Sequence, residues 1–111
     1  MLCLILSALL FGQQPIDYVM TGRNDEAIKS YENLIEKARS PDEKSKYMLE
    51  LGNIYYDKIG DLNKAMMIYQ EIIKKFPKVK DLHVVYYIIG QILESKENYL
   101  DAAKSYEVVA T

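Results

Sequence analysis

The sequence has little of the material from which turns, disulfides and metal sites are built. Its 111 residues include one cysteine, one histidine, three prolines and five glycines, and tryptophan is absent. One cysteine excludes an intrachain disulfide, and no histidine–cysteine cluster offers the spacing of metal ligands. So few glycines and prolines leave little for β-turns and favour a helix-rich chain.

An excess of positive charge is also missing. Lysine and arginine number 14 against 16 aspartates and glutamates, for a formal net charge of −2. Nucleic-acid affinity depends largely on Lys and Arg neutralising phosphates, so this balance argues against a nucleic-acid partner. No nucleophile elbow or phosphate loop is present, and His83 fits a surface residue. We therefore expect no catalysis, no cofactor, no metal and no small-molecule substrate.

The first twelve residues, MLCLILSALLFG, are almost entirely apolar and carry no charge. They are too few to span a membrane, which takes about 20 residues. Their length suits the apolar region of a secretory signal peptide, although no Lys or Arg precedes it and no clear cleavage site follows. Two interpretations stay open: a signal for export to the periplasm or cell surface, or an apolar helix packed on a cytoplasmic protein. Pro15 favours a break after the segment.

Landmark residues recur along the rest of the chain at a nearly constant interval. A hydrophobic residue followed by glycine occurs as Leu51-Gly52 and again, 38 residues later, as Ile89-Gly90. Alanine followed four positions later by tyrosine occurs at intervals of 38 and 37 residues, as Ala27 and Tyr31, Ala65 and Tyr69, and Ala102 and Tyr106. Periods of about 20–50 residues predict stacked structural repeats.

Apolar residues at helical spacing predict two helices in the middle unit. The short turn at 58–61 separates them, with Gly60 suited to a helix C-terminus and Asp61 to the next N-cap. Pro77 ends the second helix.

The third unit repeats this plan, with helices over about 82–95 and from about 99 to the end. The first unit is clear only in its second helix, over about 24–38, which Ser40 and Pro41 should close.

These units resemble the tetratricopeptide repeat family, whose signature is W-x2-L-G-x2-Y, then A-x3-F, then P. The middle unit carries Leu51-Gly52-x2-Tyr55, Ala65-x3-Tyr69 and Pro77, with Met48 in place of the tryptophan and one extra residue in its turn. The third unit carries Tyr86-x2-Ile89-Gly90 and Ala102-x3-Tyr106, and the first carries Tyr18, Gly22 and Ala27-x3-Tyr31, with Pro15 where the glycine should be.

The resemblance implies an all-α fold in which antiparallel helix pairs stack as a right-handed superhelix of about two and a half repeats. The expected units are a partial first repeat at 16–41, a second at 45–77 and a truncated third at 82–111. Glycine in mid-helix costs about 1 kcal/mol relative to alanine. We expect Gly52 to face Ala65, and Gly90 to face Ala102, where two helices cross closely.

In this family the first helix of each repeat lines a concave groove that binds protein partners. Tyr55 and Tyr86 fall at packing positions, so Tyr56 and Tyr87 are the tyrosines expected in the groove. The groove residues expected by position are Lys46, Leu49, Glu50, Asn53, Tyr56, Asp57, Val84, Tyr87, Ile88, Gln91, Glu94 and Ser95.

The sequence therefore predicts a noncatalytic scaffold that binds a peptide or helix of a partner whose identity it does not reveal. A clamp for acidic chaperone tails is disfavoured, because Asn53 alone matches and Val84 and Ile88 stand where Lys and Arg are needed. Internal packing of Tyr87 and Ile88 is an alternative to groove binding. The runner-up function is a structural oligomerisation module that stacks on itself or within a larger cell-envelope assembly. Self-association would use the apolar surface at Ala103, Val108 and Val109.

Overall fold

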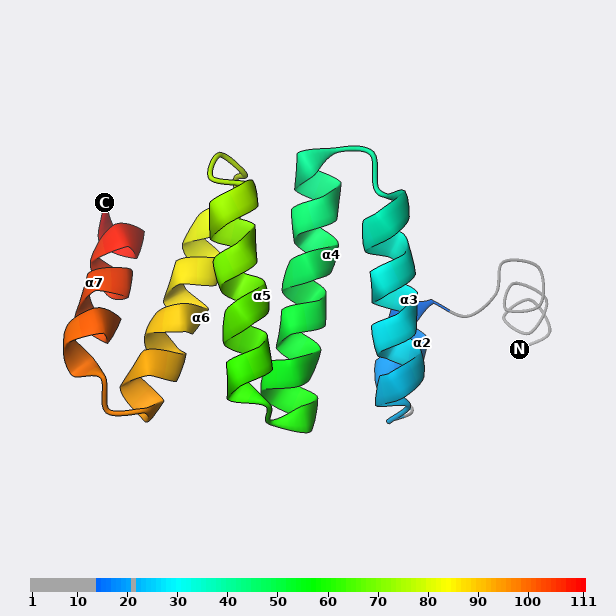
Figure 1. Cartoon of the computed structure of the whole chain (residues 1–111), viewed down its shortest axis with the longest axis horizontal. Coiled ribbons are helices and arrows are strands. Elements are labelled where there is room, and N and C mark those ends of the chain that lie inside the picture. Colours follow the sequence, from blue (N-terminus) through cyan, green and yellow to red (C-terminus); the bar gives the residue numbers. More distant parts are fainter. Residues whose placement is uncertain (1–13, 21) are drawn as a thin grey trace.

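The computed structural model describes residues 14–20 and 22–111, and their regular structure is entirely helical. Figure 1 shows the helices side by side in a row, with α2 and α3 at one end and α7 at the other. The elements are α2 (Pro15–Met20), α3 (Asn24–Lys37), α4 (Pro41–Asn53), the π-helix η1 (Ile54–Ile59), α5 (Leu62–Lys75), α6 (Leu82–Ser95) and α7 (Tyr99–Ala110). This arrangement confirms the predicted all-α helical repeat fold.

The predicted signal peptide or apolar helix at residues 1–12, with Cys3, lies outside the described residues. Within them, no helix combines the length and the hydrophobicity needed to cross a membrane. Pro15 is the first residue of α2 and is buried.

The Ser40-Pro41 pair starts a helix rather than closing the one before it. Helix α3 ends at Lys37, and the Ser40 hydroxyl oxygen accepts a 3.1 Å hydrogen bond from the Glu43 amide as the N-cap of α4. Pro41 is tolerated at the first helical position, where its missing N–H would have no helical partner. Helix α4 therefore begins before residue 45, the predicted start of the second repeat.

The predicted turn chemistry of the middle unit is confirmed. Gly60 has a φ of 79°, which is the left-handed conformation that glycine adopts without strain, and its N–H donates to the Tyr55 carbonyl. The Asp61 carboxylate accepts a 3.0 Å hydrogen bond from the Lys64 amide and caps α5. Helix α5 ends at Lys75, two residues before Pro77.

The extra residue of the middle unit lies in a helix and not in the turn. The π-helix η1 continues α4 as far as Ile59, whereas the matching helix of the third unit, α6, is α-helical to its end. A π-helical turn holds one more residue than an α-helical turn, because its hydrogen bonds join residues i and i+5. The insertion therefore keeps its backbone groups paired, which a longer loop would not do.

Two clusters of buried side chains form the core, and the α4–η1 segment contributes to both. The larger cluster joins α4, α5 and α6, and the smaller joins α3, α4 and η1. Their members are Met48, Ala65, Tyr69, Ile72, Val85, Ile89 and Ile92 in the first, and Ala27, Tyr31, Leu51 and Ile54 in the second. Tyr55 and Tyr86, which the sequence placed in the core, are half-buried.

The close approach between paired helices joins glycine to tyrosine rather than to alanine. A β-carbon built on Gly52 would lie 2.5 Å from Cε1 of Tyr69, and the three nearest atoms all belong to that ring. A β-carbon on Gly90 would lie 2.5 Å from Cε1 of Tyr106. The sequence predicted Ala65 as the close neighbour of Gly52, whereas the atoms nearest to the glycine belong to the Tyr69 ring, one helical turn further along α5.

Candidate functional site

The structure brings several predicted groove residues together around one cavity. This cavity, which we call the α2–α4 cavity, has a volume of about 190 Å³ and lies between α2, α3 and the α4–η1 segment. Its lining residues are Ile16, Val19, Tyr31, Glu50, Asn53, Ile54, Asp57 and Lys58. Three of these, Glu50, Asn53 and Asp57, were expected in the groove from the sequence.

The remaining predicted groove residues differ in how far they reach the surface. Leu49, Tyr56 and Ile88 are half-buried and pack against the larger core cluster, so much of their surface serves the interior. Val84 and Gln91 are also half-buried, whereas Lys46, Glu94 and Ser95 are exposed. Tyr87 keeps 49% of its surface exposed, which makes it the most accessible tyrosine among the predicted groove residues.

Tyrosines from the second helices reach residues of the predicted groove. The Tyr69 hydroxyl donates a 2.6 Å hydrogen bond to Oδ1 of Asn53. The Tyr106 hydroxyl donates a 2.8 Å hydrogen bond to Oε2 of Glu94. Sequence reasoning missed these contacts, although the repeated pairing of a first-helix glycine with a second-helix tyrosine was the signal that could have revealed them.

The ionisation of these tyrosines reflects their surroundings. Burial raises the pKa of Tyr31 to about 12, and the nearby Glu50 carboxylate adds to the effect. Burial also raises the pKa of Tyr69, with the Asp57 charge contributing. The pKa of Tyr106 rises to about 12 through desolvation and its hydrogen bond to Glu94. All three hydroxyls therefore stay protonated at neutral pH and act as hydrogen-bond donors.

An aromatic pair lies at the α6–α7 end of the predicted groove. The rings of Tyr87 and Tyr106 have centroids 5.8 Å apart and planes tilted by 51°. Such a separation and tilt lie in the favourable range for aromatic pairs. Tyr106 also lies beside Gly90 and donates its hydroxyl to Glu94, so the half-exposed Tyr87 ring has an aromatic neighbour on α7.

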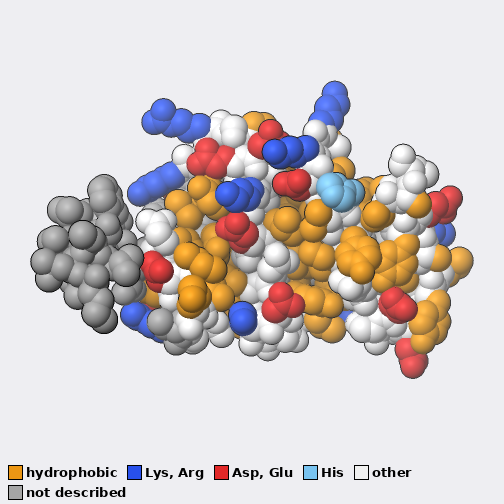
Figure 2. Space-filling model, turned by 180° about the vertical axis from the view of Figure 1, so that it is seen from behind, with side chains coloured by type: hydrophobic (Ala, Val, Ile, Leu, Met, Phe, Trp, Pro, Cys, Tyr) orange, Lys and Arg blue, Asp and Glu red, His pale blue; other side chains and the backbone are white. Residues whose placement is uncertain are grey.

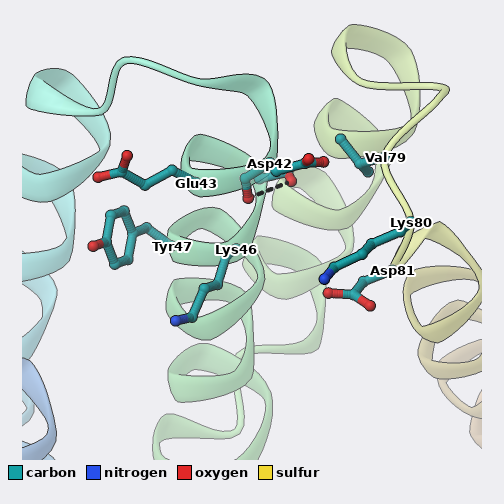
Figure 3. A pocket seen from close by; sticks show the side chains of 8 residues that line it. Asp42, Glu43, Lys46, Tyr47, Val79, Lys80 and Asp81 are labelled. Atoms are coloured by element: carbon teal, nitrogen blue, oxygen red, sulfur yellow. Dashed lines mark hydrogen bonds between the residues drawn. The ribbon is translucent and has the colours of Figure 1, made fainter.

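A second hollow lies beside the start of α4, with a volume of about 410 Å³ (Figure 3). It lies between the first turns of α4 and the segment that joins α5 to α6, and Lys46 is the predicted groove residue in it. Its lining residues are Asp42, Glu43, Ser45, Lys46, Tyr47, Val79, Lys80 and Asp81. Both charge signs occur in it, and the buried Ser45 hydroxyl is already used as a donor to the Asp42 carbonyl.

The outer surface mixes apolar and charged groups. Figure 2 shows hydrophobic side chains in orange, interspersed with acidic groups in red, along much of the face opposite to that of Figure 1. In residues 14–20 and 22–111, no three His, Cys, Asp or Glu side chains are placed to hold a metal ion. His83 is exposed, and its Nδ1 lies 3.2 Å from the Lys80 carbonyl oxygen.

Comparison with known proteins identifies the middle unit. Residues 46–78 match the family described as Tetratricopeptide repeat. The match begins within α4 and ends just after Pro77, so it covers the helix pair whose motif resembles that family. Neither the curated proteins nor the solved structures that were compared with the chain gave a match. Residues 46–78 therefore match a tetratricopeptide repeat, in agreement with the resemblance that the motif of the middle unit indicates.

Proposed function

We propose that this protein is a noncatalytic scaffold that binds a peptide or helix of a protein partner on the face formed by α2, α4–η1 and α6. Tetratricopeptide repeats act generally as protein–protein interaction scaffolds, and their stacked helices form extended binding surfaces. The observation that carries the proposal is Tyr87, a half-exposed ring that packs against the ring of Tyr106.

A supported aromatic ring is suited to be an anchor for a partner. Binding hot spots are enriched in tyrosine, because a rigid ring offers a large contact area at a low cost in side-chain entropy. Near Tyr87, Val84 and Ile88 add apolar surface, and Gln91 offers hydrogen-bonding groups. This mixture fits an amphipathic helix or an extended peptide.

A selection from a displayed random-peptide library, with the full chain as bait, tests this proposal. We expect selected peptides to bind the unchanged protein and to lose about tenfold or more in affinity for Tyr87→Ala, which is the effect of a moderate hot spot. Tyr99→Ala is the matched control, because Tyr99 is 63% exposed on α7, outside the predicted groove residues. Equal losses for both variants, or no selected peptide, would contradict groove binding.

A second candidate function is self-association through α7. The outer surface of α7 exposes Tyr99, Val108 and Leu100, the last with 72% of its surface accessible, and Ala103 is exposed as well. Apolar surface of this kind is typical of contacts between proteins. Sedimentation velocity at increasing concentration tests it, and Leu100→Glu should shift any oligomer towards the monomer. A monomer at all concentrations would exclude this function.

A further inference from the structure

The lining of the α2–α4 cavity combines an apolar floor with acidic walls. Ile54 and Tyr31 are only 4% and 6% exposed, and Val19 is half-buried, so these side chains form a fixed floor. Glu50 and Asp57 contribute two carboxylates, against one ammonium group from Lys58. Pockets for cofactors and drug-sized ligands measure about 300–1,000 Å³, so a cavity of about 190 Å³ suits a single side chain.

We infer that this cavity accepts a lysine or arginine side chain of the bound peptide. The inference rests on the proposed function and specifies the chemistry of the partner. The aliphatic stem of the basic residue would lie against Ile16, Val19 and Ile54, and its charged end would lie near the carboxylates of Glu50 and Asp57. An acidic side chain in the same place would meet two like charges.

The carboxylates of the cavity are not used by the ion pairs of the described chain. Those pairs join Arg23 to Glu26, Lys75 to Glu71 and Lys104 to Asp101, all within single helices or beside a helix start. None of these ion pairs of the described chain therefore neutralises Glu50 or Asp57, although Glu50 also accepts a hydrogen bond from the Tyr31 hydroxyl. Two tyrosines respond to these charges, since Glu50 and Asp57 contribute to the raised pKa values of Tyr31 and Tyr69 respectively.

Part of the cavity lining is also held in place before a partner arrives. Asn53 is fixed by the hydroxyl of the fully buried Tyr69, and Ile54 belongs to the smaller core cluster. A prearranged site loses little conformational entropy on binding, which favours affinity. The basic residue should consequently enter a site that already has its shape.

The test uses the peptides selected on the full chain and measures their affinity by fluorescence anisotropy. We expect the selected peptides to share a lysine or arginine beside apolar residues. Replacing that basic residue with glutamine should weaken binding, and the double variant Glu50→Gln, Asp57→Asn should weaken it about tenfold. The matched control is Glu36→Gln, Glu107→Gln, which removes the same charge from exposed positions on α3 and α7 and should leave the affinity unchanged.

Raising the salt concentration provides a second measurement on the unchanged protein, because it screens charge pairs at a surface and should weaken binding. This inference would be overturned by selected peptides that share no basic residue and bind the Glu50→Gln, Asp57→Asn variant as well as the unchanged protein. If those peptides still lose affinity for Tyr87→Ala, the proposed function stands. If no peptide distinguishes Tyr87→Ala from Tyr99→Ala, the proposed function fails and this inference fails with it.

Discussion

The ring of Tyr69 lies so close to Gly52 that a β-carbon at the glycine would be 2.5 Å from Cε1 of the tyrosine. The ring is fully buried between α4 and α5, so it has no free space into which it could move. The same relationship recurs in the next unit between Gly90 and Tyr106, where the tyrosine is half-buried. The two pairs therefore form a natural comparison.

Replacing Gly52 with alanine should destabilise the protein, although alanine is the better helix former. The propensity gain is about 1 kcal/mol, whereas overpacking a core costs about 1–3 kcal/mol. Gly90→Ala should cost less, because the half-buried Tyr106 ring can shift towards solvent. Urea denaturation of both variants gives the two free energies of unfolding. A Gly52→Ala protein more stable than the unchanged one would show that the ring tolerates the methyl group.

Enlarging Ala65 to leucine should also destabilise the fold. Ala65 is completely buried in the larger core cluster, so the added atoms have no space, and we expect a loss of about 1–3 kcal/mol. Ala103→Leu is the control, because Ala103 is exposed on α7 and surface substitutions usually change stability by less than about 0.5 kcal/mol. The denaturation midpoints of the two variants should separate clearly, and coincident midpoints would argue against a tightly packed core at Ala65.

Removing the Tyr69 hydroxyl should weaken the link between α5 and α4. Tyr69→Phe keeps the ring beside Gly52 but loses the hydrogen bond to Asn53, so we expect a loss of about 0.5–1.5 kcal/mol in the free energy of unfolding. Tyr99→Phe serves as the control, because the Tyr99 side chain is largely exposed. The prediction would be wrong if both tyrosine-to-phenylalanine variants unfolded at the same denaturant concentration.

Stability should fall at alkaline pH. The pKa of Tyr31 is about 12 in the folded chain, against an ordinary value of 10.0. As the pH rises, the unfolded chain therefore loses the Tyr31 hydroxyl proton before the folded chain does. The contribution of Tyr31 to the free energy of unfolding is complete below pH 10 and is lost as the pH rises towards 12. For Tyr31 the slope is at most about 1.4 kcal/mol per pH unit.

Denaturation of the unchanged protein and of a Tyr31→Phe variant between pH 8 and pH 12 measures the contribution of Tyr31 to stability. The variant should show a shallower loss of stability above pH 10, because phenylalanine has no proton to release. Identical pH profiles would mean that Tyr31 ionises equally readily in the folded and unfolded chains.

The helices could be predicted closely from the sequence because their signals are local. Helix α6 spans Leu82–Ser95, as its apolar spacing predicts, and α3 ends within one residue of the predicted boundary. Gly60 and Asp61 adopt their predicted roles because a left-handed φ and an N-cap hydrogen bond depend on a few neighbouring residues.

The candidate site was predicted less completely. The sequence indicated Glu50, Asn53 and Asp57 through their repeat positions, and the structure places them around one cavity. It did not indicate Ile16 or Tyr31 as members of the same cavity, because they belong to other helices and the first unit departs from the repeat motif at Pro15.

The sequence by itself determined that this protein is a stack of helix pairs, because apolar periodicity and a repeat of 37–38 residues specify both the helices and their order. Only the tertiary structure decided that Gly52 makes room for Tyr69, and that the extra residue enters the π-helix η1. Both outcomes depend on how two helices fill the space between them. Side chains from distant parts of the chain must fill that space together, and a local sequence pattern does not predict how their volumes fit.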